Sequence, residues 1–169
     1  MIKRILLITG LALGGGWIVR ACLFEGIWVA SGSMEPTLPL GTHYFVNRMI
    51  YHLHAPLRGD IIVFKSPVDS EKGLIKRVIA VGGDRIEMRS KQVFLNGTAL
   101  SEPYAVYKRA AERLVGDNSP PVTVPADNVF VLGDNRDESE DSSVWKDPKT
   151  GEHIYYVHDQ DIEGRLIVP

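Results

Sequence analysis

Most of the chain after residue 43 consists of short runs rich in β-branched and aromatic residues, separated by clusters of Gly, Pro, Asn and Asp. Runs of this length and composition are typical of β-strands. We predict strands at residues 44–46, 60–64, 75–81, 85–88, 92–95, 129–132 and 153–157. Asn96-Gly97, which lies between two apolar runs, is a strong signal for a tight hairpin turn. Because helical periodicity is scarce here, the sequence predicts an all-β domain built mostly from antiparallel sheet.

Two less patterned segments interrupt the predicted strands. Residues 101–125 contain a charged stretch followed by a pair of prolines, and we expect a loop or a short subdomain there. Residues 146–152 are expected to form another loop before the last predicted strand. With 169 residues, the chain is long enough for one domain of ordinary size with a real hydrophobic core.

Charge and motif content argue against several classes of function. The chain has 19 Lys and Arg residues against 21 Asp and Glu residues, a formal net charge of -2, and no basic block suited to a phosphate backbone. Nucleic acid is therefore not an expected partner. We also expect no metal or nucleotide cofactor, because zinc, EF-hand and phosphate-binding motifs are absent from the sequence. Cys22 is the single cysteine, so the chain cannot form an internal disulfide.

An apolar run at residues 5–19 dominates the start of the chain. As a helix it would span about 22 Å, less than a bilayer core of about 30 Å, which fits the apolar part of a cleavable signal peptide. However, the apolar character resumes after Arg20, and an arginine near a helix end can reach the membrane surface. A spanning helix that ends at about Phe24 is therefore feasible. A lipid-attachment signal ending at Cys22 is a poorer alternative, because arginine is out of character in it.

We therefore predict a membrane anchor at residues 1–24 and a β-rich catalytic domain at residues 25–169. Two basic residues, Lys3 and Arg4, hold the start of the anchor in the cytoplasm by the positive-inside rule. The domain would then lie on the extracytoplasmic side of the cytoplasmic (inner) membrane, behind a single pass. The apolar residues at 24–29 either dip into the membrane interface or form a first core strand.

The stretch Ser-Gly-Ser-Met-Glu-Pro-Thr-Leu at residues 31–38 contains the serine on which we place the chemistry, Ser33. A serine hydroxyl is a poor nucleophile until a base removes its proton. None of the five histidines lies in a setting typical of a Ser-His-Asp arrangement. Lys76 lies in an apolar, strand-like run, where burial would lower its pKa and let it act as a neutral general base. An ordinary turn around Ser33 and a solvent-facing Lys76 are the alternatives.

Four sequence boxes occur in a fixed order behind the predicted anchor: SGSMEPTL at 31–38, RGDIIVFK at 58–65, IKRVIAVGGDRI at 75–86 and VLGDNRDES at 131–139. Ile-Glu-Gly-Arg at 162–165 closes the series. Through these boxes the chain resembles the type I signal peptidases, membrane-bound Ser-Lys proteases that remove signal peptides from exported proteins. The resemblance covers nearly the whole chain.

The resemblance implies a role for each matching residue. Ser33 would be the nucleophile and Lys76 the general base, while the hydroxyl of Ser31 and the backbone N–H of Ser33 would form the oxyanion hole. Ser139 would orient the lysine through a hydrogen bond. The remaining implied residues support the site (Asp134, Arg136, Asp141) or line the substrate pockets (Met34, Leu38, Leu74, Ile75).

The implied reaction is acyl transfer on preproteins that carry a signal peptide, next to membrane lipid. Relatives of this family prefer small side chains one and three residues before the cut, an Ala-X-Ala pattern bound as an extended strand. A lysine base predicts a rate that falls at acid pH, as the amine becomes protonated.

One departure from the family pattern bears on the function. Where many relatives have an arginine two residues after Asp141, this chain has Ser143, so the expected ion pair is either absent or made by another residue. Three alternatives stay open: a peptidase dedicated to pilin subunits for conjugation, a LexA-like self-cleaving regulator, and an inactive membrane-anchored domain that binds exported peptides. The LexA-like regulator would need a DNA-binding segment where this chain has its predicted anchor.

Overall fold

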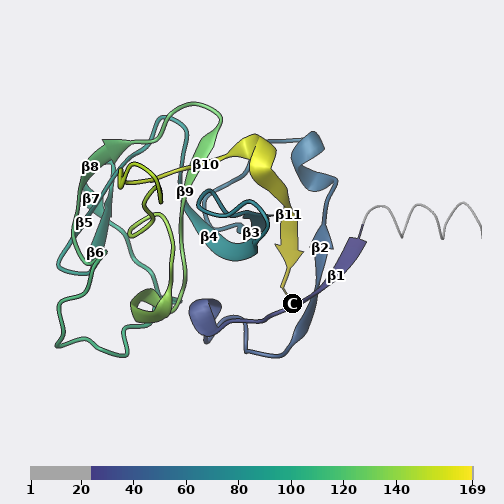
Figure 1. Cartoon of the computed structure of the whole chain (residues 1–169), viewed down its shortest axis with the longest axis horizontal. Coiled ribbons are helices and arrows are strands. Elements are labelled where there is room, and N and C mark those ends of the chain that lie inside the picture. Colours follow the sequence, from purple (N-terminus) through teal and green to yellow (C-terminus); the bar gives the residue numbers. More distant parts are fainter. Residues whose placement is uncertain (1–23, 169) are drawn as a thin grey trace, which may run out of the picture.

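Two antiparallel sheets make up the computed structural model, which describes residues 24–168. Figure 1 shows the smaller sheet at one end of the molecule and β1 and β2 of the larger sheet at the other. The larger sheet has seven strands in the order β1-β2-β11-β3-β4-β9-β10. Their bounds are β1 Phe24–Trp28, β2 His43–Asn47, β3 Ile61–Lys65, β4 Gly73–Val81, β9 Asn128–Leu132, β10 Val157–His158 and β11 Ile162–Ile167.

The smaller sheet has four strands in the order β7-β6-β5-β8. Their bounds are β5 Arg85–Arg89, β6 Gln92–Leu95, β7 Thr98–Ala99 and β8 Ser119–Thr123. The predicted hairpin is confirmed: β6 pairs with β7 across Asn96-Gly97, and both turn residues have positive φ, 52° and 83°. Two positive φ values in succession define the turn type that matches the twist of a two-stranded hairpin.

Strand β9 is buried on both faces, which explains its unbroken apolar sequence. Phe130 and Leu132 pack in one core cluster with residues of β4, β5 and β6, so this cluster joins the two sheets. Val129 and Val131 pack in a second cluster with residues of β3 and with Trp145. Each fully buried side chain of this kind contributes about 1.5–3 kcal/mol to folding. The third cluster lies around β2, β3 and β11.

Several predicted strands are confirmed within one to two residues, namely β2, β3, β4, β5, β6 and β9. The strand predicted at residues 153–157 is wrong, because His153 makes only an isolated bridge to Lys146 and a strand begins only at Val157, as β10 (Val157–His158). Tyr155 and Tyr156 in this segment pack against the core from irregular backbone instead. The last strand is β11, between β2 and β3, which the strand prediction missed.

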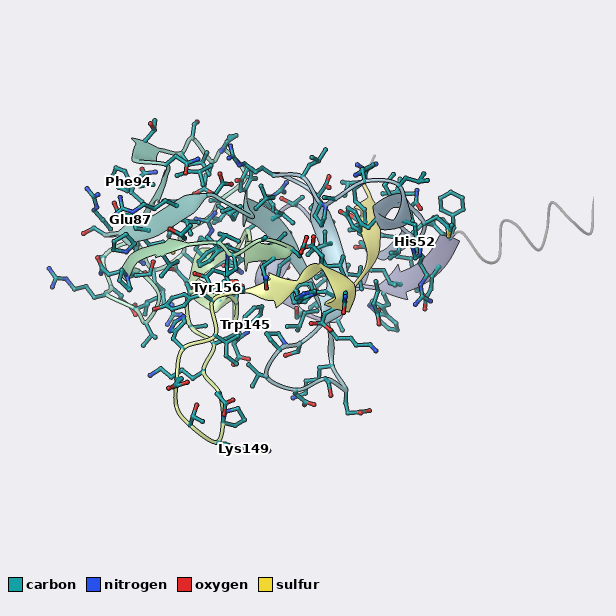
Figure 2. All side chains as sticks on the ribbon, turned by 90° about the horizontal axis from the view of Figure 1, so that it is seen from above. His52, Glu87, Phe94, Trp145, Lys149 and Tyr156 are labelled. Carbon is teal, nitrogen blue, oxygen red and sulfur yellow. The ribbon has the colours of Figure 1, made fainter. Side chains whose placement is uncertain are left out.

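The segment at 101–125 also contains a strand that the prediction missed, β8. Pro120 and Pro121 lack the N–H that a central strand needs, which hid the strand in the sequence. The structure accommodates them because β8 is the edge of the smaller sheet and pairs only with β5. Residues 146–152 do form a loop, and Figure 2 shows Lys149 at its tip, away from Glu87 and Phe94 on the smaller sheet.

The apolar stretch at 24–29 forms a strand, β1, at the edge of the larger sheet, but it is not the core strand of the prediction, because most of its residues are exposed. Phe24 begins β1 and is not the end of a helix, because it pairs with Asn47 of β2. Trp28 is 65% exposed whereas Val29 is buried. The predicted anchor at residues 1–23 lies outside the described residues. Among residues 24–168, no helix is long and apolar enough to cross a membrane.

Gly164 of β11 pairs with Val63 of β3 directly after a bulge between Ile162 and Gly164, and the backbone of β2 comes close to it there. A Cβ atom at this position would lie 2.6 Å from both the carbonyl oxygen of Asn47 and Cγ1 of Val46.

We expect Gly164→Ala to lower the free energy of unfolding by about 1–3 kcal/mol, since a tightly packed site resists added volume. Gly73→Ala is the matched control, because a Cβ there meets no atom within 4 Å. Equal urea midpoints for the two variants would contradict this packing.

Candidate active site

Ser33 lies in a short 3-10 turn, η1 (Gly32–Met34), that is fixed to the core on its far side. Met34 and Leu38 are 1% and 0% exposed and belong to the cluster around β2, β3 and β11. The backbone N–H of Leu38 donates to the carbonyl of Met34 at 2.9 Å, which closes the segment between them. Both side chains, predicted to line substrate pockets, therefore serve at least to hold the turn. Ser33 itself is 7% exposed.

Lys76 lies in the middle of β4, between β3 and β9, and is 2% exposed. The alternative of a solvent-facing lysine is thereby excluded. Its Nζ donates to Oγ of Ser33 at 2.7 Å, so the structure brings the two residues predicted for the chemistry into direct contact across 43 positions of sequence. Oγ of Ser31, an exposed residue, lies 3.2 Å from Oγ of Ser33.

Burial is the main influence on the Lys76 amine and lowers its pKa from 10.5 to about 8, because the ammonium form loses its hydration. The carboxylates of Asp141, Glu140 and Asp134 oppose this shift by favouring the charged form. A substantial fraction of the amine is therefore neutral slightly above neutral pH. The neutral amine accepts the hydroxyl proton of Ser33, which is the requirement for a general base.

Asp134 anchors the loop after β9 to the strand that carries the lysine. Its two carboxylate oxygens accept from Nε and Nη2 of Arg77 at 2.8 and 2.6 Å. Thr37 donates its hydroxyl to the same carboxylate, and the Arg77 guanidinium lies 4.0 Å from the ring centroid of Tyr104. Sequence reasoning did not identify Arg77, although it directly follows Lys76 in a matching box.

Arg136 supports the same loop from the other side. It forms a two-pronged ion pair with Glu102 at 2.6 and 3.0 Å, and the two side chains are 3% and 6% exposed. Its Nε also donates to the carbonyl of Gly133 at 3.0 Å. Glu102 comes from the poorly patterned segment at 101–125, so its role could not be read from the sequence.

Asp141 is 1% exposed and has no ion-pair partner among the described residues. Instead, one oxygen accepts from the backbone N–H and the hydroxyl of Ser143 at 3.0 and 2.7 Å, and the other accepts from Gly133 N at 3.0 Å. Gly116 packs on Ser143, since a Cβ at 116 would lie 2.6 Å from the Ser143 hydroxyl. Hydrogen bonds thus replace the arginine at this position, and the inactive-domain alternative loses its main support.

Ser139 makes no hydrogen bond to Lys76, which differs from the predicted contact. Its Oγ is buried without a partner in the described part of the chain. Ser139 instead packs closely on Gly133, where an added Cβ would overlap Ser139 Oγ and lie 2.5 Å from the carbonyl oxygen of Ser33. The orienting role of Ser139 therefore stays a prediction. Position 133 requires glycine, because the backbone there lies against both Ser139 and the carbonyl of Ser33.

Leu74 and Ile75, the other two predicted pocket residues, are half-buried on β4 just before the lysine. Ile75 packs against the cluster that holds Met34, whereas Leu74 packs against the cluster of Trp145. Leu74 also lines an open hollow of about 330 Å³ with Val144, Trp145 and six further residues, among them Glu140. Figure 2 labels Trp145 at the base of the 146–152 loop.

Comparisons with known proteins agree with this geometry. The family model described as "Signal peptidase, peptidase S26" matches residues 1–169. Signal peptidase I P of Bacillus subtilis subsp. natto is 38% identical over 144 residues, which covers 83% of this chain and 75% of that protein. Signal peptidase I of Leptolyngbya laminosa is 37% identical over 175 aligned positions, which covers 99% of this chain and 76% of that protein.

A solved structure gives the same result. The crystal structure of a signal peptidase I from Enterococcus faecalis V583 matches with a TM-score of 0.51 and 31% identity, covering 68% of this chain and 98% of that one. A β domain in which a buried lysine is hydrogen-bonded to a serine fits the class of serine peptidases. The chain belongs to the signal peptidase family, peptidase S26, and is a proteolytic enzyme of this family.

The ion pair of Arg77 with Asp134 predicts a large loss of stability when it is broken. The two side chains are 12% and 1% exposed, so Arg77→Ala leaves a buried carboxylate with no cation. We expect a loss of about 3–5 kcal/mol in the free energy of unfolding, measured with urea on the full-length chain in mild detergent. Arg48→Ala, which breaks an exposed pair with Glu25, should change it by less than about 1 kcal/mol. Similar losses in both variants would show that the buried pair of Arg77 with Asp134 contributes no more to stability than an exposed ion pair.

Proposed function

We propose that the chain is a serine endopeptidase that removes N-terminal signal peptides from exported preproteins, using Ser33 as nucleophile and Lys76 as general base. The observation that supports this most is the 2.7 Å hydrogen bond between a buried lysine and the serine of the first box. Membership of the signal peptidase family supports the substrate class.

In the first half of the reaction, neutral Lys76 takes the proton of Ser33 Oγ, which attacks the carbonyl carbon at the cleavage site. The tetrahedral intermediate collapses when the C–N bond breaks, and the protonated Lys76 gives its proton to the leaving amine. The new N-terminus departs, and the signal peptide stays on Ser33 as an ester. In the second half, Lys76 takes a proton from water, which attacks the ester carbonyl carbon. The bond from this carbon to Ser33 Oγ then breaks, and Lys76 returns the proton to Ser33 Oγ.

The negative charge on the carbonyl oxygen needs donors that are already in place. The backbone N–H of Ser33 and the hydroxyl of Ser31 fill this role in the proposal, and each is worth roughly 3–4 kcal/mol by comparison with other oxyanion holes. The 3.2 Å distance between the two hydroxyl oxygens supports the placement of Ser31 beside the nucleophile.

The preferred site in the proposal has small residues one and three positions before the cut, in the Ala-X-Ala pattern. An extended peptide alternates its side chains, so these two residues face the protein together. Ile75, which packs against the cluster of Met34 and Leu38, and Leu74, which packs against the cluster of Trp145, would limit the size of the accepted side chains. An anchor helix before β1, within residues 1–23, would hold the domain on the extracytoplasmic face of the inner membrane, in contact with lipid, where preproteins emerge.

Replacement of either dyad residue should abolish cleavage. We expect Ser33→Ala and Lys76→Ala to lower kcat/KM at least about a thousandfold, because the two groups act as a unit. The assay is cleavage of a preprotein with an Ala-X-Ala site by full-length protein in detergent. Ser119→Ala is the control, because it removes a buried hydroxyl from the smaller sheet and should leave the rate within about threefold. Robust cleavage by Ser33→Ala would exclude it as the nucleophile.

The pH dependence should follow the lysine. Because only the neutral amine can take the serine proton, kcat/KM should rise about tenfold per pH unit on the acid side and level off above pH about 8. The profile is measured with the same preprotein, in buffers of constant ionic strength. A rate that stays flat down to about pH 4, in the range where carboxylates titrate, would rule out a lysine base.

A further inference from the structure

Asn135 contacts both peptide groups that flank the nucleophile. It directly precedes η3 (Arg136–Glu138), which lies beside η1 at the same edge of the molecule in Figure 1. Its side-chain Nδ2 donates to the carbonyl oxygen of Gly32 at 3.0 Å, and its backbone N–H donates to the carbonyl oxygen of Ser33 at 3.1 Å. The backbone N–H of Glu35 also donates to the Gly32 carbonyl oxygen, at 3.1 Å, as the hydrogen bond of the 3-10 turn. Asn135 thus supplies the side-chain donor to the peptide before Ser33 and a backbone donor to the peptide after it.

The peptide between Gly32 and Ser33 has a special position in the proposed reaction, because its N–H belongs to the oxyanion hole. In a trans peptide the C=O and N–H groups are rigidly coupled and point in opposite directions. A donor that holds the Gly32 carbonyl oxygen therefore also sets the direction of the Ser33 N–H. Oxyanion stabilisation depends on this direction being fixed before the charge develops.

The surroundings allow only one orientation of the Asn135 amide. Nδ2 also donates to Oε2 of Glu138 at 2.8 Å, so two acceptors face the same end of the side chain. Only an NH₂ group can satisfy both. Oδ1, at the other end, is buried without a partner in the described chain, an unfavourable arrangement that the two Nδ2 hydrogen bonds offset. Asn135 is 0% exposed, so it cannot reach a substrate.

Glu138 is itself held from outside. Lys108 Nζ lies 3.1 Å from Oε2 of Glu138 in η3 and 3.4 Å from Oε2 of Glu35, the residue after η1. It therefore bridges the two turns that meet at the site. The hydrogen-bond path runs from Lys108 through Glu138 and Asn135 to the Gly32 carbonyl. This path is separate from the hydrogen bond between Lys76 and Ser33.

We propose that Asn135 is a positioning residue for the oxyanion hole, whose side-chain amide orients the N–H of Ser33 through the Gly32 carbonyl. The inference rests on the proposed function. Loss of the amide lowers transition-state stabilisation and leaves substrate binding unchanged, because the oxyanion exists only after attack on the carbonyl. The loss therefore appears in kcat and not in KM.

The test compares Asn135→Ala and Asn135→Asp in the cleavage of the Ala-X-Ala preprotein. Aspartate keeps the volume of the side chain but presents an acceptor to Gly32 O. Both variants should lower kcat at least about tenfold with KM within about twofold, and aspartate should cost at least as much as alanine. The acid limb of the Asn135→Ala pH profile should stay where it is in the unaltered chain. Asn128→Ala, which loses an amide bond to the Ala126 carbonyl far from the site, should keep its kcat.

A role in packing alone predicts a different order, with Asn135→Asp close to the unaltered chain and only Asn135→Ala impaired. That result, or a change confined to KM, would overturn the proposal. Ser33→Ala is run in parallel: if it cleaves as fast as the unaltered chain, the proposed function fails and this inference with it. With Ser33→Ala inactive, the outcome for Asn135 stands by itself.

Glu138→Ala provides a variant that should not disturb folding, since its side chain is 49% exposed. It removes one of the two acceptors that orient the amide, and we expect kcat to fall about threefold or more with KM unchanged. Glu112→Ala is the matched control, because it removes another exposed glutamate that pairs with a cation in the same region. A Glu138→Ala kcat equal to that of Glu112→Ala would overturn the proposal.

Discussion

The hydrogen bond between Lys76 and Ser33 is possible only because a lysine is buried at the centre of the larger sheet. Burying an ammonium is unfavourable, and the protein relieves this by lowering the pKa of the amine, which also makes it a base. Burial also makes the pKa of Lys76 sensitive to the charged groups around it. Asp141 favours the charged lysine, and its charge is held by hydrogen bonds from Ser143 and Gly133, with no arginine beside it. The pKa of Lys76 therefore reflects a balance between burial and nearby carboxylates.

The nucleophile turn is held by its own next residues and by the loop after β9, which is about a hundred positions away in the sequence. Leu38 fixes it to the core, Asp134 joins the loop after β9 to β4 through Arg77, and Asn135 holds the peptides on both sides of Ser33. Of these residues, those that touch the turn itself lie in loops, whereas Arg77 and the core around Leu38 belong to strands of the larger sheet. The larger sheet thereby brings these loops together. A rigid site on such a frame keeps the serine, its base and the oxyanion donors in place before substrate arrives.

Local sequence pattern predicted the fold class, most strands of the larger sheet and the hairpin at Asn96-Gly97, because these depend on neighbouring residues. It failed for β8 and β11, whose prolines or mixed composition become compatible with a strand only through their place in a sheet. The resemblance to the family boxes predicted Ser33 and Lys76 as nucleophile and general base. They could not reveal Asn135 or Glu102, because the partners of a buried amide or ion pair are decided by tertiary packing. Ser143 showed in the sequence that the family arginine is missing. Only the structure shows that Ser143 hydrogen-bonds to Asp141 in its place.

The most direct measurement is an NMR titration of the Lys76 side-chain nitrogen in full-length protein with ¹⁵N-labelled lysine, assigned by its absence in Lys76→Ala. The resonance should shift with a pKa of about 8, below the ordinary value of 10.5, so that the neutral form grows as the pH rises through 8. A Lys76 resonance that titrates near 10.5 would show that the amine stays charged at working pH. It would contradict the central claim that burial turns this lysine into the base for Ser33.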